Sequence, residues 1–517
     1  RRRPAAPLRP ARRQGPDDRQ GGQQGGEAAG SQVEEAAEEG VDESEEPFCW
    51  QKAWYPLAVV ADLDPGRPAR LELLGEDLVA WMDGEGAWRV FEDRCPHRNV
   101  PLSEGRVEED GTLLCSYHGW RFSGEGRVVA LPQVPDADFE RLREHPRACA
   151  AVRPAQVRHG LLWVWGESSE NAALESALVE PNVVEELEDP AMEGRAADFI
   201  WQHRDLPYGW EAAIENVVDA SHVAVTHHNM ISNRYTDPAP IETAWERRPS
   251  KRGGFKFRMK NLKPRKGMEG YVSTTDFRPP GMVHNRATAP NGASTTLLLY
   301  FSPTKPGRCR LLVSFLLVRS ADGGEAPKAM PNAKSAGVEL RQAAFALLQS
   351  PLFPRWFVHV VAPLFLHQDL VFLHRQQSIL QRREEGLGKT WRQSYWTPAQ
   401  TDSGSVALRR WLDWNHGVGW SSAAAAPPML ADEEKGALFE TYRSHTEQCV
   451  HCREALRNFS LAERALQSGA LVASAAGLGS ANWGLLAGGL LLGLGSEACG
   501  AVKRLFYEYR YEAQDNN

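Results

Sequence analysis

Two short motifs combine cysteine with histidine in a way that could hold an iron–sulfur cluster. Cys95 and His97 form a C-x-H motif, and after seventeen intervening residues Cys115 and His118 form a C-x-x-H motif. Two thiolates and two imidazoles suit a [2Fe–2S] cluster in which one iron takes both sulfurs and the other takes both ring nitrogens. Because neutral imidazole removes negative charge from one iron, such a cluster accepts an electron more readily than an all-cysteine cluster. A structural zinc site is the alternative, although zinc fingers usually place their cysteines first and their histidines last.

A second candidate metal site follows the pattern N-x-x-D-x-x-H-x-x-x-x-H, formed by Asn216, Asp219, His222 and His227. Iron(II) that must bind dioxygen typically uses two histidines and one carboxylate, which leaves coordination positions open. The first three residues recur every three positions, so we expect them near one face of a helix. His227 lies about 140° further round an ideal helix than His222, so the helix must end or loosen between them. The adjacent His228 competes with His227 for the assignment.

The carboxylate ligand must come from a distant part of the chain. Asp369 is the single carboxylate in the apolar stretch 364–374. An aspartate in such surroundings is rarely buried unless it is paired or bound to a metal. Asp369 is therefore the predicted third ligand, and an exposed aspartate on an amphipathic helix is the alternative. We interpret the nearby His367 and His374 as ordinary helix residues.

A C-x-x-C motif is formed by Cys449 and Cys452. On its own this motif is weak, and the two readings are a redox-sensitive dithiol and a pair of inert cysteines before an apolar segment. The remaining cysteines show no ligand spacing and are predicted to be free thiols: Cys49, Cys149, Cys309 and Cys499.

Charge and composition divide the chain into segments. The net charge of −8 argues against nucleic acid as a partner. Residues 1–20 are rich in arginine and residues 27–46 are dominated by glutamate, alanine and glycine, so 1–46 is predicted to be disordered. The basic, acid-poor start is typical of an organelle transit peptide joined to an acidic linker, and an exposed basic arm is the alternative.

The remaining chain predicts an α+β protein. Short strand-like runs punctuated by Gly, Pro and Asp predict a small antiparallel β-domain over 47–167, with both ligand loops at hairpin tips. Residues 168–462 mix strands with longer helical stretches at 336–380. The predicted strands are Leu71–Leu74, Leu78–Met82, Trp88–Phe91, Val128–Pro132, Gly160–Trp165, Thr295–Phe301 and Arg310–Val318.

The C-terminal segment, 463–517, is predicted to be a membrane anchor. Residues 465–496 contain no charged side chain and are rich in Gly, Ala and Leu. One membrane-spanning helix needs about 20 residues, so this run is long for one span and short for two. Asn482 and its neighbouring glycines could mark a turn between two short segments. A buried tail in a soluble protein is the alternative.

The residues around the motifs resemble those of Rieske-type non-haem iron oxygenases. The resemblance rests on the segments 93–98, 101–105 and 115–120. It implies that Cys95 and Cys115 bind one iron and that His97 and His118 bind the other. Rieske proteins of electron-transfer complexes carry an extra cysteine in each ligand loop, and none occurs between Cys95 and His118, which favours the oxygenase type.

A more specific resemblance, to the pheophorbide a oxygenase group of plastids, rests on segments 204–209, 215–219 and 227–228. It implies that His222, His227 and Asp369 hold the mononuclear iron. It also implies that Asp219 couples the cluster of one subunit to the iron of its neighbour. Asn216 is the second predicted catalytic residue. The group has a helix-grip catalytic domain and a similar C-terminal cysteine pair.

The resemblance also implies a function. We expect a ferredoxin-dependent monooxygenase of a chloroplast membrane, thylakoid or inner envelope, that assembles as a homotrimer and uses O2 to open pheophorbide a, a chlorophyll-derived tetrapyrrole. Hydroxylation of protochlorophyllide or a phyllobilin is the alternative within the enzyme class. Outside it, the alternatives are a redox-sensing subunit of a plastid protein-import complex and a zinc-binding interaction protein.

Overall fold

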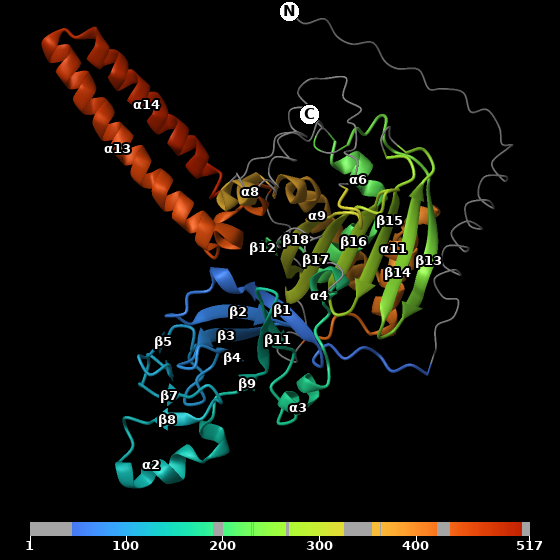
Figure 1. Cartoon of the computed structure of the whole chain (residues 1–517). Coiled ribbons are helices and arrows are strands. Elements are labelled where there is room, and N and C mark those ends of the chain that lie inside the picture. Colours follow the sequence, from blue (N-terminus) through green and yellow to red (C-terminus); the bar gives the residue numbers. More distant parts are fainter. Residues whose placement is uncertain are drawn as a thin grey trace, which may run out of the picture.

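A computed structural model describes residues 44–189, 200–228, 230, 232–264, 268–324, 354–361, 363–420 and 435–508. The expected transit segment, apart from residues 44–46, and residues 336–353 of the expected helical stretch lie outside this range. The described chain contains both strands and helices, as the α+β prediction requires (Figure 1).

The N-terminal part, up to residue 167, consists of three small antiparallel sheets with the strand orders β1-β11-β10, β2-β3-β4-β9 and β5-β6-β7-β8. The expected strands are present, most of them with bounds shifted by one or two residues. The strands are β1 (Trp54–Val59), β2 (Ala69–Leu73), β3 (Glu76–Met82), β4 (Trp88–Glu92), β5 (Arg106–Val107), β6 (Leu113–Leu114), β7 (Arg121–Phe122), β8 (Val128–Ala130), β9 (Val152–Arg153), β10 (Ala155–Arg158) and β11 (Leu161–Trp165). The short helices are η1 (Val60–Asp62), α2 (Asp136–Arg143) and η2 (Pro146–Ala148).

The prediction that both ligand loops lie at hairpin tips is correct for one loop and wrong for the other. The Cys115 loop joins β6 to β7, which pair antiparallel. The Cys95 loop instead leads from β4 in one sheet to β5 in another. The first loop therefore bridges two sheets, and this brings it beside the second.

The second domain is built on one seven-stranded antiparallel sheet, in the order β12-β18-β17-β16-β15-β14-β13. Its strands are β12 (Gln202–Leu206), β13 (Ile241–Ser250), β14 (Gly254–Asn261), β15 (Val272–Arg278), β16 (Met282–Thr288), β17 (Ser294–Lys305) and β18 (Arg308–Val318). Helix α5 (Trp210–Val218) packs on β16, β17 and β18 and is contacted by α9 (Pro363–Leu387) and α11 (Ser403–Trp414). A sheet with a helix held against it agrees with the expected helix-grip domain. The shorter helices are α3 (Ala172–Ala177), α4 (Glu185–Glu188), α6 (Ser221–Thr226), α8 (Arg355–Val361), α10 (Trp391–Ser394), η4 (Gln400–Asp402), α12 (Lys435–Leu438) and the π-helix η5 (Tyr442–Thr446).

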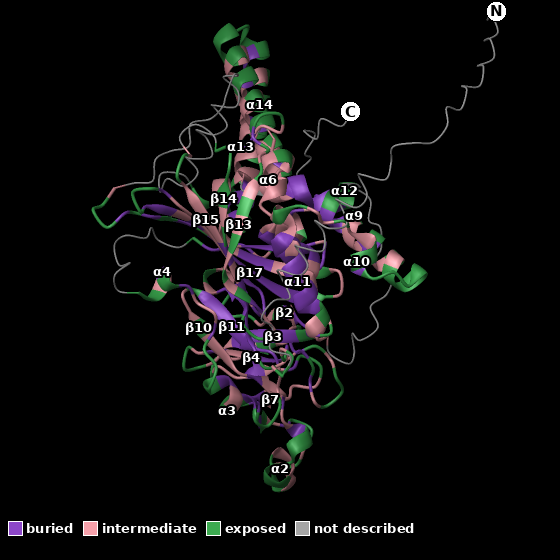
Figure 2. Ribbon diagram, turned by 90° about the vertical axis from the view of Figure 1, so that its right-hand side faces the viewer, coloured by how far each residue is buried: buried purple, intermediate pink, exposed green. Residues whose placement is uncertain are grey.

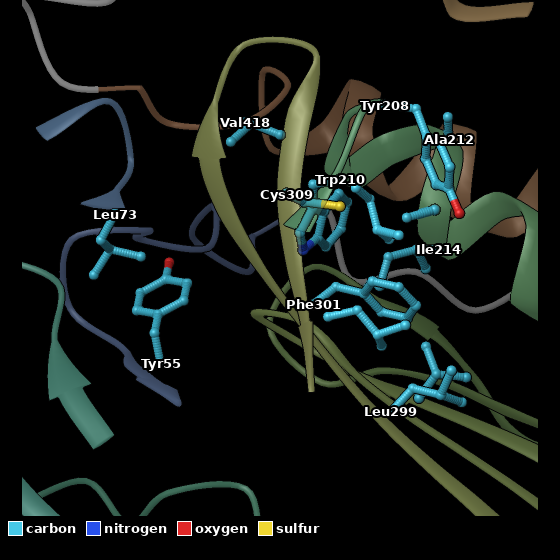
Figure 3. Close-up of a cluster of buried hydrophobic side chains, with 14 of the residues drawn as sticks. Tyr55, Leu73, Tyr208, Trp210, Ala212, Ile214, Leu299, Phe301, Cys309 and Val418 are labelled. Carbon is cyan, nitrogen blue, oxygen red and sulfur yellow. The ribbon is translucent and has the colours of Figure 1, made fainter. Parts of the chain in front are cut away.

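One hydrophobic core joins the two domains. It extends from Tyr55 and Leu73 of the first domain to Trp210 on α5 and Phe301 on β17 (Figure 3). Trp210 also packs edge-on against Trp50, with ring centroids 5.1 Å apart. Aromatic pairs of this kind contribute about 0.5–1.5 kcal/mol beyond the burial of their area. Figure 2 shows the buried residues concentrated in the sheets and in α11.

The C-terminal segment forms a helical hairpin that projects from the second domain (Figure 1). Helix α13 (Val450–Ser480) packs along α14 (Trp483–Arg504), and Asn482 caps α14 by accepting a hydrogen bond from the backbone N–H of Gly484 at 2.9 Å. This confirms the expected turn at Asn482. Helix α14 is long and apolar enough to cross a membrane, with a mean hydropathy of 1.6 and little burial in the protein. The domain boundary expected at residue 462 falls inside α13.

Candidate iron centres

The two Rieske-type loops share one backbone design. The N–H of Cys95 donates to the carbonyl of Val100, and the N–H of Cys115 donates to the carbonyl of Trp120, each at 2.8 Å. In both loops the residue four positions after the cysteine has a left-handed backbone, with φ of 57° at Asn99 and 71° at Gly119. Left-handed backbone favours Asn and Gly, which explains these residue types. Two equivalent turns thus present one cysteine and one histidine each.

The four side chains of these loops converge with the sulfurs inside and the imidazoles outside. Cys95 and Cys115 are each 1% exposed, whereas His97 is exposed and His118 is half-buried. The two imidazole rings lie 4.6 Å apart, and His97 is stacked on Trp120 at the same distance. Burial, with Cys115 nearby, raises the pKa of the Cys95 thiol to about 12. Burial and the neighbouring His118 lower the pKa of His97.

This arrangement fits a [2Fe–2S] cluster with mixed ligands. Two buried thiol groups side by side are poorly solvated, and iron would convert them to thiolates and neutralise their charge. The exposed imidazoles would place the outer iron at the protein surface, where an electron can be exchanged. Four donors from two loops would also suit zinc by number.

The second candidate site lies between α6 and α9. Helix α5 ends at Val218 and α6 begins at Ser221, so the expectation that Asn216, Asp219 and His222 share one helix is wrong. Asp219 is held in this break, where one of its oxygens accepts hydrogen bonds from the backbone N–H and hydroxyl of Ser221, at 2.7 and 2.6 Å. The side chain competes with the helical backbone for hydrogen bonds, which explains the interruption.

The chain stops being helical again before the second histidine. Helix α6 ends at Thr226, and His227 follows with φ −89° and ψ 35°. Both histidines can therefore face α9, as their spacing required. One nitrogen or oxygen from each of His222, His227 and Asp369 lies within 4.8 Å of the other two. The sequence-predicted ligands are thus brought together across more than 140 residues of chain.

Burial controls the charges of this group. His227 is 0% exposed and Asp369 is 5% exposed. Burial, reinforced by Asp219, raises the pKa of Asp369 to about 7, and burial lowers the pKa of His227 to about 4. Burial acts to lower the pKa of His222 as well, but contact with Asp219 and the charge of Asp369 outweigh it and raise that pKa. Burial likewise opposes ionisation of Asp219, but His222 and Ser221 outweigh it and lower its pKa.

Two further observations support a ferrous ion at this position. The Nε2 atom of His227 lies 3.5 Å from Asp369 Oδ2, and His222 Nδ1 lies 3.5 Å from Asp219 Oδ2. The Nε2 atom of His227 is buried and has no hydrogen-bond partner among the described residues. Buried polar atoms are normally satisfied, and a metal ion would satisfy this one, whereas His222 Nδ1 faces Asp219. Two histidines and one carboxylate are the set that non-haem iron(II) takes when it leaves positions open for oxygen.

Sequence reasoning did not find the residues that orient His227. Gln368 Oε1 lies 2.9 Å from His227 Nδ1, and Phe365 stacks on the imidazole with the ring centroids 3.6 Å apart. An N–H group at Nδ1 that donates to Gln368 leaves the Nε2 lone pair facing Asp369. A metal-bound histidine usually has such a partner on its other nitrogen. The position of Gln368 immediately before Asp369 was the only available signal.

The structure also shows where the other histidines near the iron site and Asn216 lie. His228 accepts a hydrogen bond from the backbone N–H of Arg234 through Nδ1, at 3.1 Å, and lies outside the group of three donors. His367 and His374 lie on α9, where they contact Arg204 and the carbonyl of Pro207, respectively. They are helix residues outside the site, as interpreted. Asn216 contributes its carbonyl to the backbone N–H of Asp219.

A second group of buried donors surrounds the C-x-x-C motif. Cys449 and Cys452 meet His359 and His445, and one atom from each of the four lies within 4.8 Å of the others. All eight cysteines are free thiols in the structure, which agrees with the expectation for the four outside the motifs. Neither histidine was a candidate in the sequence analysis.

Comparison with known proteins assigns the class. A family model described as Rieske [2Fe-2S] domain matches residues 53–146, and one described as Pheophorbide a oxygenase matches residues 277–386. With the fold and the two centres, these matches define a Rieske non-haem iron oxygenase. This class carries a [2Fe–2S] cluster and a mononuclear iron and uses O2 with an external electron donor.

Three relatives cover most of the chain. Pheophorbide a oxygenase of Oryza sativa subsp. japonica is 30% identical over 84% of this chain and 78% of that protein. Flavonoid 8-hydroxylase 2 of Ocimum basilicum is 29% identical over 91% of this chain and 87% of that protein. Protochlorophyllide-dependent translocon component 52 of Arabidopsis thaliana is 28% identical over 82% of this chain and 77% of that protein. The chain belongs to the pheophorbide a oxygenase family. All three relatives are named as chloroplastic, which supports a plastid location.

Proposed function

We propose that this protein is a ferredoxin-dependent monooxygenase that oxygenates a chlorophyll-derived tetrapyrrole, with pheophorbide a as the preferred substrate. The observation that carries the proposal is the presence of both centres in one chain of this family: the Cys95/His97/Cys115/His118 group and the His222/His227/Asp369 group. A redox-sensing subunit would need only the first group. A zinc-binding interaction protein would need neither iron centre.

The residues of the second centre can hold iron and still leave coordination positions open for oxygen. His222, His227 and Asp369 would hold the ferrous ion. When bound, this iron supplies oxygen activation and the cluster supplies single electrons. Gln368 fixes the orientation of the His227 ring, and Asp369 must lose its proton to bind metal. Stacking of Phe365 on His227 excludes water from that side of the site.

The two centres of one chain are separated in space. In Figure 1 β5 and β7 lie at the lower left and α6 at the upper right, and Figure 2 also shows β7 and α6 far apart. We therefore propose a head-to-tail homotrimer in which the exposed His97 or the half-exposed His118 approaches Asp219 of the next subunit. Asp219 suits this role because it is partly exposed and ionised and lies 3.5 Å from His222.

The helical hairpin would anchor the protein to a chloroplast membrane, either thylakoid or inner envelope. Its apolar side chains are exposed, with Leu471, Trp483 and Leu490 at 73%, 83% and 66%. Large exposed apolar surfaces on soluble proteins mark interaction sites. The two close-packed helices could enter the membrane together, because small residues let them approach: Gly489 lies directly against Ser474.

The proposal is tested by turnover of defined substrates. Reduced ferredoxin, O2 and the purified enzyme are incubated separately with pheophorbide a, protochlorophyllide, a phyllobilin and a flavone, and the products are identified by mass spectrometry using isotopically labelled O2. Labelled oxygen in opened pheophorbide a supports the proposal. Preferential labelling of protochlorophyllide or a phyllobilin would identify that tetrapyrrole, and not pheophorbide a, as the substrate.

The flavone assay tests a second candidate activity. A flavonoid 8-hydroxylase aligns with a larger share of this chain than the other two relatives do. Labelling of the flavone alone would refute the tetrapyrrole proposal and assign flavonoid hydroxylation. A lack of turnover with all substrates, in enzyme with both iron centres loaded, would favour the redox-sensing role.

A further inference from the structure

Four potential metal ligands converge where the helical hairpin joins the catalytic domain. His359 comes from α8, His445 from the π-helix η5, Cys449 from the N-cap of α13, and Cys452 from its first turn. His359 Nδ1 lies 3.3 Å from Cys449 Sγ and 3.7 Å from Cys452 Sγ. His445 Nε2 lies 3.4 Å from Cys452 Sγ. Three elements therefore direct their donor atoms at one point.

These donors are shielded from water. Their exposed fractions are 4% for His359, 5% for His445, 0% for Cys449 and 1% for Cys452. A thiol is a weak hydrogen-bond donor, so two thiols cannot satisfy two buried imidazoles well. Burying polar groups without good partners is unfavourable, and a cation at the centre would remove that penalty.

The orientation of His445 is fixed by a residue outside the group. His445 Nδ1 lies 2.8 Å from the carbonyl oxygen of His203, so the ring donates its Nδ1 proton there. This leaves the lone pair of Nε2 directed at Cys452. A backbone carbonyl on the far nitrogen is the usual support for a metal-bound histidine. His203 in turn lies 3.2 Å from Asp62, whose other oxygen accepts a hydrogen bond from the backbone N–H of Val450.

We propose that His359, His445, Cys449 and Cys452 bind one Zn²⁺ ion in a closed, structural site. Two thiolates and two neutral imidazoles are a common zinc ligand set, and C-x-x-C is the usual spacing for the cysteine pair. Four protein ligands fill a tetrahedral ion and leave no position for substrate or water. A dithiol that acts by forming a disulfide would not need two histidines directed at its sulfurs.

The site would hold together three parts of the molecule. It fixes the start of α13 against α8, and through His203 it contacts strand β12 of the catalytic sheet. Through Asp62 it contacts the Rieske domain. Its surroundings are apolar, with Val360, Leu456 and Phe506 buried beside the two cysteines. The zinc ion would therefore set the position of the hairpin relative to both domains.

The first test uses the unmodified holoenzyme. Metal analysis is expected to give about one zinc per chain in addition to iron, and X-ray absorption at the zinc edge is expected to show sulfur at about 2.3 Å and nitrogen at about 2.0 Å. Zinc that has replaced iron at His222, His227 and Asp369 would show nitrogen and oxygen only. That result, the absence of zinc, or a Cys449–Cys452 disulfide would overturn the proposal.

The second test compares two histidine variants. His445→Asn removes a proposed ligand, whereas His451→Asn changes a histidine that lies between the two cysteines in sequence and contacts Arg355 instead. The first variant is expected to lose at least tenfold in zinc content or affinity, and the second to retain zinc. The signal of the reduced Rieske cluster reports whether each variant is folded. Equal zinc in both variants, with the Rieske cluster intact in each, would refute the zinc assignment. That result would leave the iron sites, and therefore the proposed function, untouched.

Discussion

The hydrogen bond between Gln368 and His227 gives a sharp test of the mononuclear site. In Gln368→Leu the Oε1 acceptor 2.9 Å from His227 Nδ1 is lost, and because His227 and Gln368 are 0% and 2% exposed, water cannot replace it. In this variant the imidazole is more stable with its proton on Nε2, the nitrogen that faces Asp369, than on the unsatisfied Nδ1. Metal binding must displace this proton, so the variant should bind iron more weakly.

The size of this effect follows from two independent estimates. Leaving a buried donor unsatisfied costs about 1–3 kcal/mol. Loss of the partner of a metal-bound histidine typically lowers metal affinity about 10- to 100-fold, which corresponds to about 1.4–2.8 kcal/mol. The two ranges agree, and complete burial places the expectation toward the upper end. In Gln368→Glu the acceptor is kept and becomes charged, so iron affinity should be equal or higher.

The assay is anaerobic titration of Fe²⁺ into protein whose Rieske cluster is already loaded. The cluster signal serves as the internal reference for folding. Gln381→Leu is the matched control, because Gln381 lies on the same helix and contacts Glu385 at an exposed position. If Gln368→Leu binds Fe²⁺ within twofold of the unmodified protein while the control also does, Gln368 does not orient an iron ligand and the proposed triad is wrong.

Three other predictions concern the charges and surfaces of the molecule. Burial raises the pKa of Asp369 to about 7, and Asp219 raises the pKa of His222, so protons compete with metal at both ligands and Fe²⁺ affinity should rise at least about tenfold per pH unit from 5.5 to 7; a flat profile in the same titration would contradict this. Asp219→Asn should lower product formation in a single turnover about 10- to 100-fold while the iron content and cluster reduction stay normal, and unchanged turnover would exclude Asp219 from the electron path. Leu490→Lys with Leu494→Lys should move the protein from the vesicle pellet to the supernatant in a sedimentation assay, whereas the control Leu461→Lys, outside the uncharged run, should not; continued sedimentation would count against the hairpin as anchor.

The sequence contained the local information about both centres. The spacings of Cys95/His97 and Cys115/His118 predicted two ligand loops, and the isolated Asp369 in an apolar stretch predicted a buried carboxylate. What the sequence did not contain was the hydrogen bonding around these residues. The break at Asp219 depends on its contact with Ser221, and the orientation of His227 depends on Gln368, which is far along the chain.

The histidines near the C-x-x-C motif were missed for a related reason. His359 precedes Cys449 by 90 residues, and no local spacing links a histidine on α8 to a cysteine on α13. His445 is close to the motif in sequence, four residues before Cys449. Its spacing alone did not mark it as a ligand, because its approach to the Cys452 sulfur depends on the π-helix that contains it. Patterns within one element are visible in a sequence, whereas contacts between elements depend on the packing of the whole domain.

The two groups of buried donors are physically connected, and this connection bears on how the hairpin could influence catalysis. His359 on α8 lies ten residues before Asp369 on α9, and α8 packs against both α9 and α13. Arg204, which follows the His203 that supports His445, contacts His367 on α9 two residues before Asp369. A shift of α13 would therefore reach α9 by two routes, through α8 and through β12. Because Asp369 must meet His222 and His227 within a narrow range of distances, the position of the hairpin and the geometry of the iron site should change together.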